Sequence, residues 1–192
     1  MRYWVSWLIV TIGALGFGGK AFGADSKIKV DIKFEYKDTP LRIKLYEVTP
    51  EFVYSTARTA LAKKMKDLPV TKPMASSILF SDKLKAKTFA LVVENSSAEN
   101  KYFFATPHTL DPVQASLGVL FECLCNHHVY KIPPKQIWYR IVRLKVDTSE
   151  ANMKKVKHVK VVHSFVEVPE QDALKNYRSM FYDQDTTVQE QP

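Results

Sequence analysis

A strict alternation of apolar and charged residues near the start of the chain limits its fold more than any other feature. From Ile28 to Tyr36 every second residue is apolar, and lysine, aspartate or glutamate fills each position between. Successive side chains of a strand point to opposite faces, so this pattern predicts a strand with one face buried and one face in water.

Further short segments of this kind follow, separated by turn signals such as residues 95–100 and Pro133-Pro134. The signal Thr49-Pro50-Glu51 precedes apolar residues at helical spacing, so we expect one short inserted helix between Pro50 and Lys66. Seven or eight short strands in a unit of this size predict an all-β fold, an antiparallel β-sandwich. The expected strands after the first are 41–45, 78–80, 87–94, 102–105, 117–125, 137–146 and 158–168.

Composition divides the chain into three parts. Residues 1–23 are typical of a signal peptide, because Arg2 precedes an apolar run of about fifteen residues and Ala21-Phe22-Gly23 offers a small-residue cleavage site. The run is shorter than the ~20 apolar residues of a membrane span. We expect a periplasmic or secreted protein, with an uncleaved membrane anchor as the alternative. Residues 24–168 form one domain, and 169–192 a polar C-terminal tail, partly helical and then disordered.

The only two cysteines stand one residue apart in Phe121-Glu-Cys-Leu-Cys-Asn-His-His128, directly before two of the five histidines. A domain of this size folds without a disulfide. A bond between Cys123 and Cys125 would be strained, because their Cα atoms lie ~6.6 Å apart on an extended strand. Thiolates and imidazoles are the ligands that Cu(I) and Zn select. A tight Zn site usually takes four ligands and a wider cysteine spacing, so the segment favours Cu(I).

The spacing also indicates which side chains act together. On an extended strand Cys123, Cys125 and His127 share one face, which gives a thiolate, thiolate, imidazole set. If the strand ends at Cys125, His128 is the alternative third ligand. The competing interpretation is that both cysteines are small buried core residues. Two further histidines, His108 and His163, are weaker candidates for the same role.

Three segments carry a resemblance to a known family. They are Lys85-Ala-Lys-Thr-Phe-Ala-Leu-Val-Val-Glu-Asn95, Phe103-Phe-Ala-Thr-Pro-His108 with Asp111-Pro112, and Phe121-Glu-Cys-Leu-Cys125. Over about residues 85–145 the chain resembles the CtaG-type copper chaperones of cytochrome c oxidase assembly, whose hallmark is Cys-Phe-Cys-Phe.

The resemblance implies an immunoglobulin-like sandwich outside the membrane. It also implies that Cys123 and Cys125 bind Cu(I), commonly across a dimer, and pass it to the catalytic copper site of the oxidase. The chain departs from the family at Leu124, which replaces an aromatic residue, and at Asn126-His127-His128, where the family has aromatic and acidic residues.

The sequence therefore predicts an exported Cu(I)-binding chaperone and not an enzyme. Its partners would be a recipient copper enzyme or another copper carrier, and the Cys-x-Cys segment also allows a metal-linked homodimer. Two other classes stay open: a thiol–disulfide protein that acts on partner cysteines, and a metal-free immunoglobulin-like interaction module. A Cys-His nucleophile is disfavoured because no third, orienting group is visible.

A formal net charge of +8 bears on the partners. Nucleic acid is not expected, because an exported chain without a recognisable binding motif has no means of reading it. The excess serves solubility, or weak attraction to an anionic membrane surface or an acidic partner. The densest run comprises Lys154, Lys155, Lys157 and Lys160.

Overall fold

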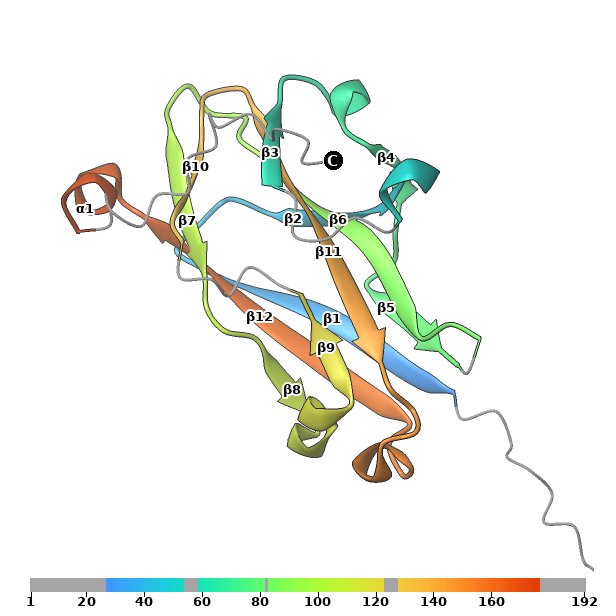
Figure 1. Cartoon of the computed structure of the whole chain (residues 1–192). Helices are drawn as coiled ribbons and strands as arrows, with labels where there is room; N and C mark the ends of the chain where they lie inside the picture. Colours follow the sequence, from blue (N-terminus) through green and yellow to red (C-terminus); the bar gives the residue numbers. More distant parts are fainter. Residues whose placement is uncertain (1–26, 54–58, 82, 123–127, 177–192) are drawn as a thin grey trace, which may run out of the picture.

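Two β-sheets face each other in the computed structural model, which describes residues 27–53, 59–81, 83–122 and 128–176 (Figure 1). The strands are β1 (Ile28–Lys37), β2 (Ile43–Val48), β3 (Thr59–Ala62), β4 (Val70–Pro73), β5 (Ser77–Phe80), β6 (Ala86–Glu94), β7 (Lys101–Ala105), β8 (Thr109–Asp111), β9 (Val119–Phe121), β10 (Tyr130–Ile132), β11 (Ile137–Val146) and β12 (His158–Val168). The helices are the 3-10 turns η1 (Pro50–Phe52), η2 (Met65–Asp67), η3 (Val113–Leu117) and η4 (Ala151–Met153), and one α-helix, α1 (Glu170–Asn176).

The strand order separates the chain into two layers. The first sheet has the order β10-β7-β12-β1-β5, with β8 also on β12. The second has the order β3-β11-β6-β2-β4, with β9 also on β11. β1 and β12 run parallel, in a register that pairs Lys29 with His158. The other strand pairs in the described residues are antiparallel.

The apolar residues of the alternating pattern in β1 form one side of the hydrophobic core. Ile28, Val30 and Ile32 are buried, while Lys29 is exposed and Asp31 is partly exposed between them. β12 contributes the same alternation in parallel register, and the second sheet faces both strands with the aromatic and aliphatic side chains of β6 and β11. The largest of these, Trp138, packs edge-on against Phe103, with ring centroids 5.1 Å apart.

The second sheet is also covered on its outer face. Phe52, Leu68 and Val70 pack there against Ala90, Val92, Tyr139 and Ile141. This double burial explains why β6 is a continuous apolar run and not an alternating one.

The predicted all-β sandwich with one short helix is confirmed, although the helix lies elsewhere and one strand pair is parallel. Within the described part of Pro50–Lys66 the chain forms η1 and β3 instead of an α-helix. β3 pairs with β11, and Arg140 Nη1 donates to Thr59 Oγ1 at 2.8 Å. Tertiary pairing therefore overrides the helical spacing of these residues.

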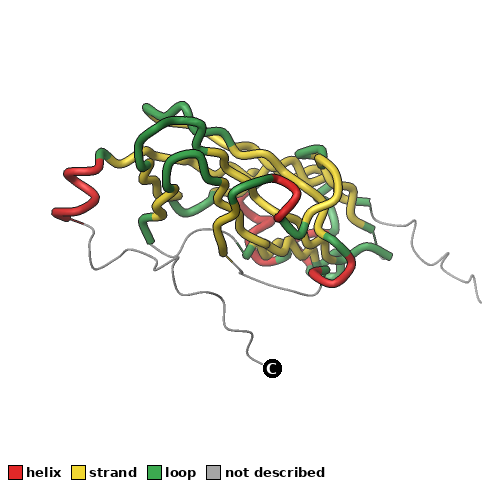
Figure 2. The backbone as a smooth tube through the Cα atoms, turned by 90° about the horizontal axis from the view of Figure 1, so that it is seen from above, coloured by secondary structure: helices red, strands yellow, loops and turns green. Residues whose placement is uncertain are grey.

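α1 follows β12 and projects from one end of the sandwich (Figure 2). Its Ala173 is buried against Tyr102, Val129 and Val168. Tyr102 Oη donates to Glu170 Oε1 at 2.9 Å. Burial, followed by this carboxylate, raises the pKa of Tyr102 to about 12. The start of the tail is thus fixed to the sandwich as a helix.

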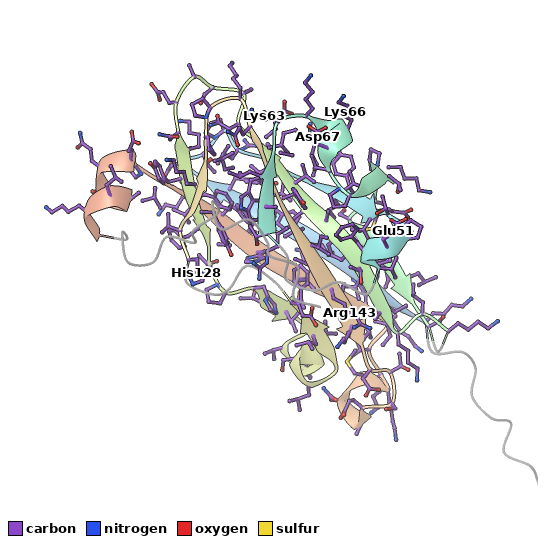
Figure 3. All side chains as sticks on the ribbon, turned by 45° about the horizontal axis from the view of Figure 1, so that its top comes forward. Glu51, Lys63, Lys66, Asp67, His128 and Arg143 are labelled. Carbon is purple, nitrogen blue, oxygen red and sulfur yellow. The ribbon has the colours of Figure 1, made fainter. Side chains whose placement is uncertain are left out.

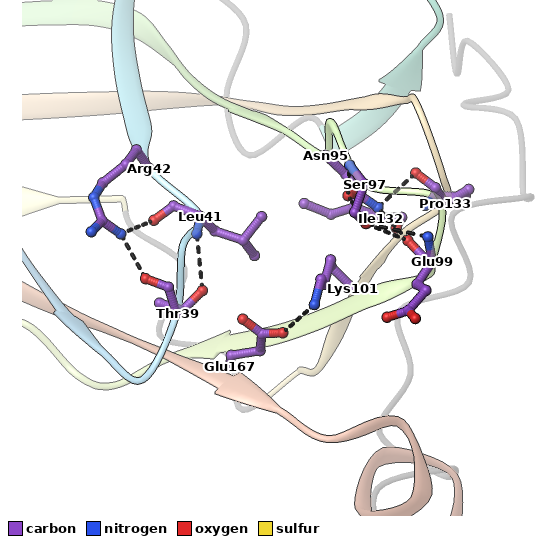
Figure 4. Close-up of polar contacts among 10 residues, drawn as sticks. All are labelled: Thr39, Leu41, Arg42, Asn95, Ser97, Glu99, Lys101, Ile132, Pro133 and Glu167. Atoms are coloured by element: carbon purple, nitrogen blue, oxygen red, sulfur yellow. Dashed lines mark hydrogen bonds and ion pairs between the residues drawn. The ribbon is translucent and has the colours of Figure 1, made fainter.

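The buried side chain of Asn95 joins two turns by hydrogen bonds, at the end of the sandwich that carries α1 (Figure 4). Asn95 Nδ2 donates to the backbone carbonyls of Glu99, Ile132 and Pro133 at 2.7, 2.9 and 3.1 Å. Its Oδ1 accepts a hydrogen bond from the Ser97 backbone N–H at 3.0 Å. One side chain thereby connects the turn after β6 to the turn after β10, and both its nitrogen and its oxygen are satisfied.

Candidate metal centre

Three of the predicted ligands, Cys123, Cys125 and His127, lie outside the described residues. The fourth, His128, is described, as is Glu122 on the other side of the gap. Glu122 follows β9 of the second sheet, and its backbone N–H donates to the Arg143 carbonyl at 2.9 Å. His128 leads into β10 of the first sheet through Val129, which is buried. The cysteine segment therefore connects the two sheets.

Each sheet has an interrupted edge beside this connection. On β12, β8 pairs with residues 160–162 and β7 with residues 165–168, and between them the Thr106 backbone N–H donates to the Ser164 carbonyl at 3.0 Å. On β11, β9 pairs with residues 144–146 and β3 with residues 137–140. Figure 1 shows β8 and β9 below β7 and β10. Among the described residues, the segment thus begins where the edge of each layer passes from one short strand to another.

Two histidines lie at this interruption, next to Phe121. The ring of His108 is 5.6 Å from that of Phe121 and 6.1 Å from that of His163, and the ring of His163 is 6.3 Å from Phe121. Phe121 stands two residues before Cys123, a span of at most about 7 Å. The structure therefore brings the two weaker histidine candidates to the beginning of the cysteine segment.

Both histidines are neutral at physiological pH. Burial lowers the pKa of His108. Burial, with a smaller contribution from His108, lowers the pKa of His163 to about 4, against a backbone hydrogen bond with Thr106 that acts in the opposite direction. A histidine binds metal as the neutral imidazole, so these rings need not lose a proton to do so.

His128 lies at the other end of the segment, half buried (Figure 3). Its ring centroid is 6.5 Å from that of Tyr130, in an edge-on arrangement. Since Tyr130 is fully buried between Phe103 and Trp138, this contact holds the imidazole near the sandwich.

One buried cation, Arg140, was not predicted from the sequence. It lies near Tyr130, the residue that His128 contacts. Arg140 is 7 % exposed and points between the sheets, as Trp138 and Val142 of the same strand do. Its Nη1 donates to Thr59 Oγ1 and lies 3.5 Å from Tyr130 Oη. Among the described residues Arg140 pairs with no carboxylate, and its Nε has no hydrogen-bond partner. The alternation of residues along β11 places Arg140 on the same face as Trp138 and Val142, and this pattern could have predicted its burial between the sheets.

The rest of the described chain offers no competing centre. Within residues 27–53, 59–81, 83–122 and 128–176 no three His, Cys, Asp or Glu side chains are grouped to hold a metal ion. The same residues contain no helix of the length and apolarity that a membrane crossing requires.

A family model for a domain of unknown function, DUF8709, matches residues 28–168. The chain belongs to this family. The matched region begins at the first residue of β1 and ends at the last residue of β12, so it coincides with the two-sheet sandwich. No curated protein matches the chain.

Proposed function

We propose that this DUF8709 protein is an exported Cu(I) chaperone that carries the ion on Cys123 and Cys125 and delivers it to a copper enzyme. The observation that carries the proposal is the cysteine pair itself. The chain has two cysteines in 192 residues, and they stand one residue apart in a connection between two sheets. Two thiolates suffice for a soft monovalent ion, and a neighbouring imidazole supplies a third ligand.

The charge of the surroundings supports a thiolate-bound cargo. Cu(I) held by two thiolates has a net charge of −1, and a buried anion needs a compensating cation. Arg140 is the only buried lysine or arginine in the described chain, and no described carboxylate pairs with it. A guanidinium also lowers the pKa of nearby thiols and so favours the thiolate form that binds metal.

The histidines support the same chemistry. His127 and His128 follow the cysteines in sequence, and His108 with His163 lies beside Phe121. Because burial lowers the pKa of His108 and His163, these two imidazoles can enter or leave the coordination of copper without a proton transfer at pH 7, which suits a site that must release its cargo. The recipient's own thiols or imidazoles would replace these ligands one at a time.

A competition titration tests the proposal. Under anaerobic, reducing conditions the full chain is titrated with Cu(I) against a coloured Cu(I) chelator, and the fraction of copper held by the protein is read from the chelator's absorbance. We expect one copper per chain, or one per two chains if copper links a dimer, at an affinity tighter than about 1 pM. Cys123→Ser/Cys125→Ser should lose this binding, whereas the exposed His158→Ala should keep it.

Other outcomes separate the alternatives. Absence of cysteine-dependent copper binding contradicts the proposal. If the reduced chain instead reduces a disulfide substrate through the same cysteines without metal, it belongs to the thiol–disulfide class. If copper is bound, a mixture with an apo oxidase copper domain shows whether the ion moves, and the loss of chelator-resistant copper from the donor measures that transfer.

A further inference from the structure

The end of the sandwich opposite α1 gathers lysines from separate parts of the chain. β1, β6, β9 and β12 begin there and β5 and β11 end there, at the bottom of Figure 1. Six exposed lysines stand on the adjoining loops: Lys27, Lys83, Lys85, Lys154, Lys155 and Lys157. We call this region the lysine end.

The charge of the lysine end is not cancelled locally. None of the six lysines forms an ion pair with a described carboxylate. Among the described residues, three exposed carboxylates, Asp111, Asp147 and Glu150, lie on the same end. Lys85 lies close enough to Asp147 to help lower its pKa, although Ser149 is the largest cause. The lysines still outnumber these carboxylates two to one.

Aliphatic side chains protrude from the same surface. Val113 and Leu117 of η3 are 74 % and 78 % exposed, the highest values among large apolar side chains in the described residues. Leu120 of β9 adds a third, and a groove of about 300 Å³ runs between Leu117, Leu120 and Lys145. Exposed aliphatic residues flanked by lysines are typical of surfaces that enter the headgroup region of a membrane.

The apolar and basic parts form one surface, because η3 packs directly on η4. Asn152 Nδ2 of η4 donates to the Gln114 carbonyl of η3. Met153 is buried against Gly118, where an added Cβ would lie 2.2 Å from the Met153 Cγ. Lys154 and Lys155 follow η4 immediately, so the protruding Val113 and Leu117 are held next to the lysine loop.

The connection to the N-terminal segment adds an independent argument. The Lys29 backbone N–H donates to the Lys157 carbonyl at 2.9 Å, so β1 starts against the lysine loop. The apolar run that ends at Phe17 lies ten residues before Lys27, a span of at most about 36 Å. Whether this run guides export or stays as an anchor, the lysine end is the part of the sandwich closest to it along the chain.

We propose that the lysine end is a docking surface for an anionic phospholipid bilayer. The lysines attract the headgroups and Val113 and Leu117 insert between them. This surface does not include the cysteine segment, so the proposal does not depend on copper binding. The aliphatic protrusions and the apolar N-terminal run favour a lipid surface over an acidic protein, for which the lysines alone would suffice.

A position-specific label tests the docking. In the full chain with Cys123→Ser/Cys125→Ser, a polarity-sensitive NBD dye is attached to Leu117→Cys or, as a control, to Leu174→Cys. Leu174 is 50 % exposed on α1, at the opposite end. In phosphatidylcholine vesicles with three-tenths phosphatidylglycerol, we expect the label at position 117 to brighten and shift to the blue, and the label at 174 to stay in water. The apolar N-terminal run is present in both proteins and precedes the lysine end, so charge variants are needed to separate its contribution from that of the lysines.

Charge variants then identify the cause. Lys154→Gln/Lys155→Gln/Lys157→Gln should weaken docking about a hundredfold, because each lysine near an anionic surface contributes about fivefold. The matched change Lys63→Gln/Lys64→Gln/Lys66→Gln, at the opposite end near η2 (Figure 3), should have no effect.

Three outcomes overturn the proposal: a label at 117 that stays in water, equal responses at 117 and 174, or equal effects of the two triple variants. If the label at 117 responds to polyglutamate but not to vesicles, the surface binds an acidic protein instead. Far-ultraviolet circular dichroism of each variant shows that the fold is intact.

Discussion

Asn95 and Arg140 are both buried polar side chains, and their surroundings differ in one respect. The side-chain amide of Asn95 has described partners for its nitrogen and its oxygen, and it joins two turns. Arg140 has one close partner, Thr59, and no described counter-charge. A satisfied polar group stabilises the fold, whereas a buried charge without a counter-charge is costly unless something else supplies it. We therefore expect a structural role for Asn95, and we propose that Arg140 serves the copper site.

The largest effect is expected at Asn95. Asn95→Ala removes the donor to three carbonyls in buried or partly buried positions, and should lower the free energy of unfolding by about 3 kcal/mol. Urea denaturation followed by circular dichroism measures this change. Ser96→Ala, at the exposed neighbouring position, should stay within about 0.5 kcal/mol. If Asn95→Ala folds and weakens copper binding without loss of stability, Asn95 does not have the structural role assigned here.

The next effect is a loss of stability at acid pH through His163. Its pKa is about 4 in the folded protein and near 6.5 when exposed, so the unfolded chain binds an extra proton between these values. Stability is therefore complete above pH 6.5 and falls as the pH drops toward 4, by about 2 kcal/mol between pH 7 and pH 5. The lowered pKa of His108 acts in the same direction.

Urea midpoints at pH 7 and pH 5 measure the contribution of His163. His163→Phe, which keeps a ring among Phe34, Phe121 and Phe165, should show a smaller pH dependence than the wild type. The exposed Ser96→Ala, which removes no titratable group, serves as the control and should keep the wild-type dependence. An unchanged dependence in His163→Phe would mean that another group titrates.

The smallest of the three predicted effects is a loss of Cu(I) affinity when Arg140 is replaced. Arg140→Gln should weaken Cu(I) binding about tenfold, which corresponds to about 1.4 kcal/mol or one pKa unit on the thiols. Arg140→Lys keeps the charge and should retain most of the affinity. Arg143→Gln, on the same strand and partly exposed, should leave the affinity unchanged.

The rates of thiol alkylation across pH give the thiol pKa in each variant, apart from copper. If Arg143→Gln and Arg140→Gln shift the thiols equally, the effect is one of net charge and the assignment of Arg140 to the site fails.

The long strands could be predicted from the sequence because burial on one or both faces leaves a pattern in the residues. The alternation from Ile28 to Tyr36 and the apolar run of β6 are such patterns, and β1 and β6 match the predicted ranges closely. β8 and β10 have three residues each, too few for a period to appear. β3 was predicted as helix and β4 was not predicted as a strand, because their pairing with β11 and β2 depends on residues far along the chain.

The candidate site was predictable in its chemistry but not in its surroundings. Cys123, Cys125, His127 and His128 form a local cluster that can be recognised from the sequence alone. The approach of His163 to Phe121 and the burial of Arg140 depend on how β12 and β11 pair, and no local pattern encodes that pairing. His163 lies on the inner face of β12 and is fully buried there.

X-ray absorption at the copper edge tests the central claim most directly. The reduced chain loaded with one equivalent of Cu(I) should show two sulfur neighbours per copper ion, with at most one nitrogen neighbour from an imidazole, and Cys123→Ser/Cys125→Ser should lose the sulfur shell. A copper ion surrounded only by nitrogen or oxygen, or a spectrum that the double cysteine variant reproduces, would contradict the assignment of Cys123 and Cys125 as the ligands.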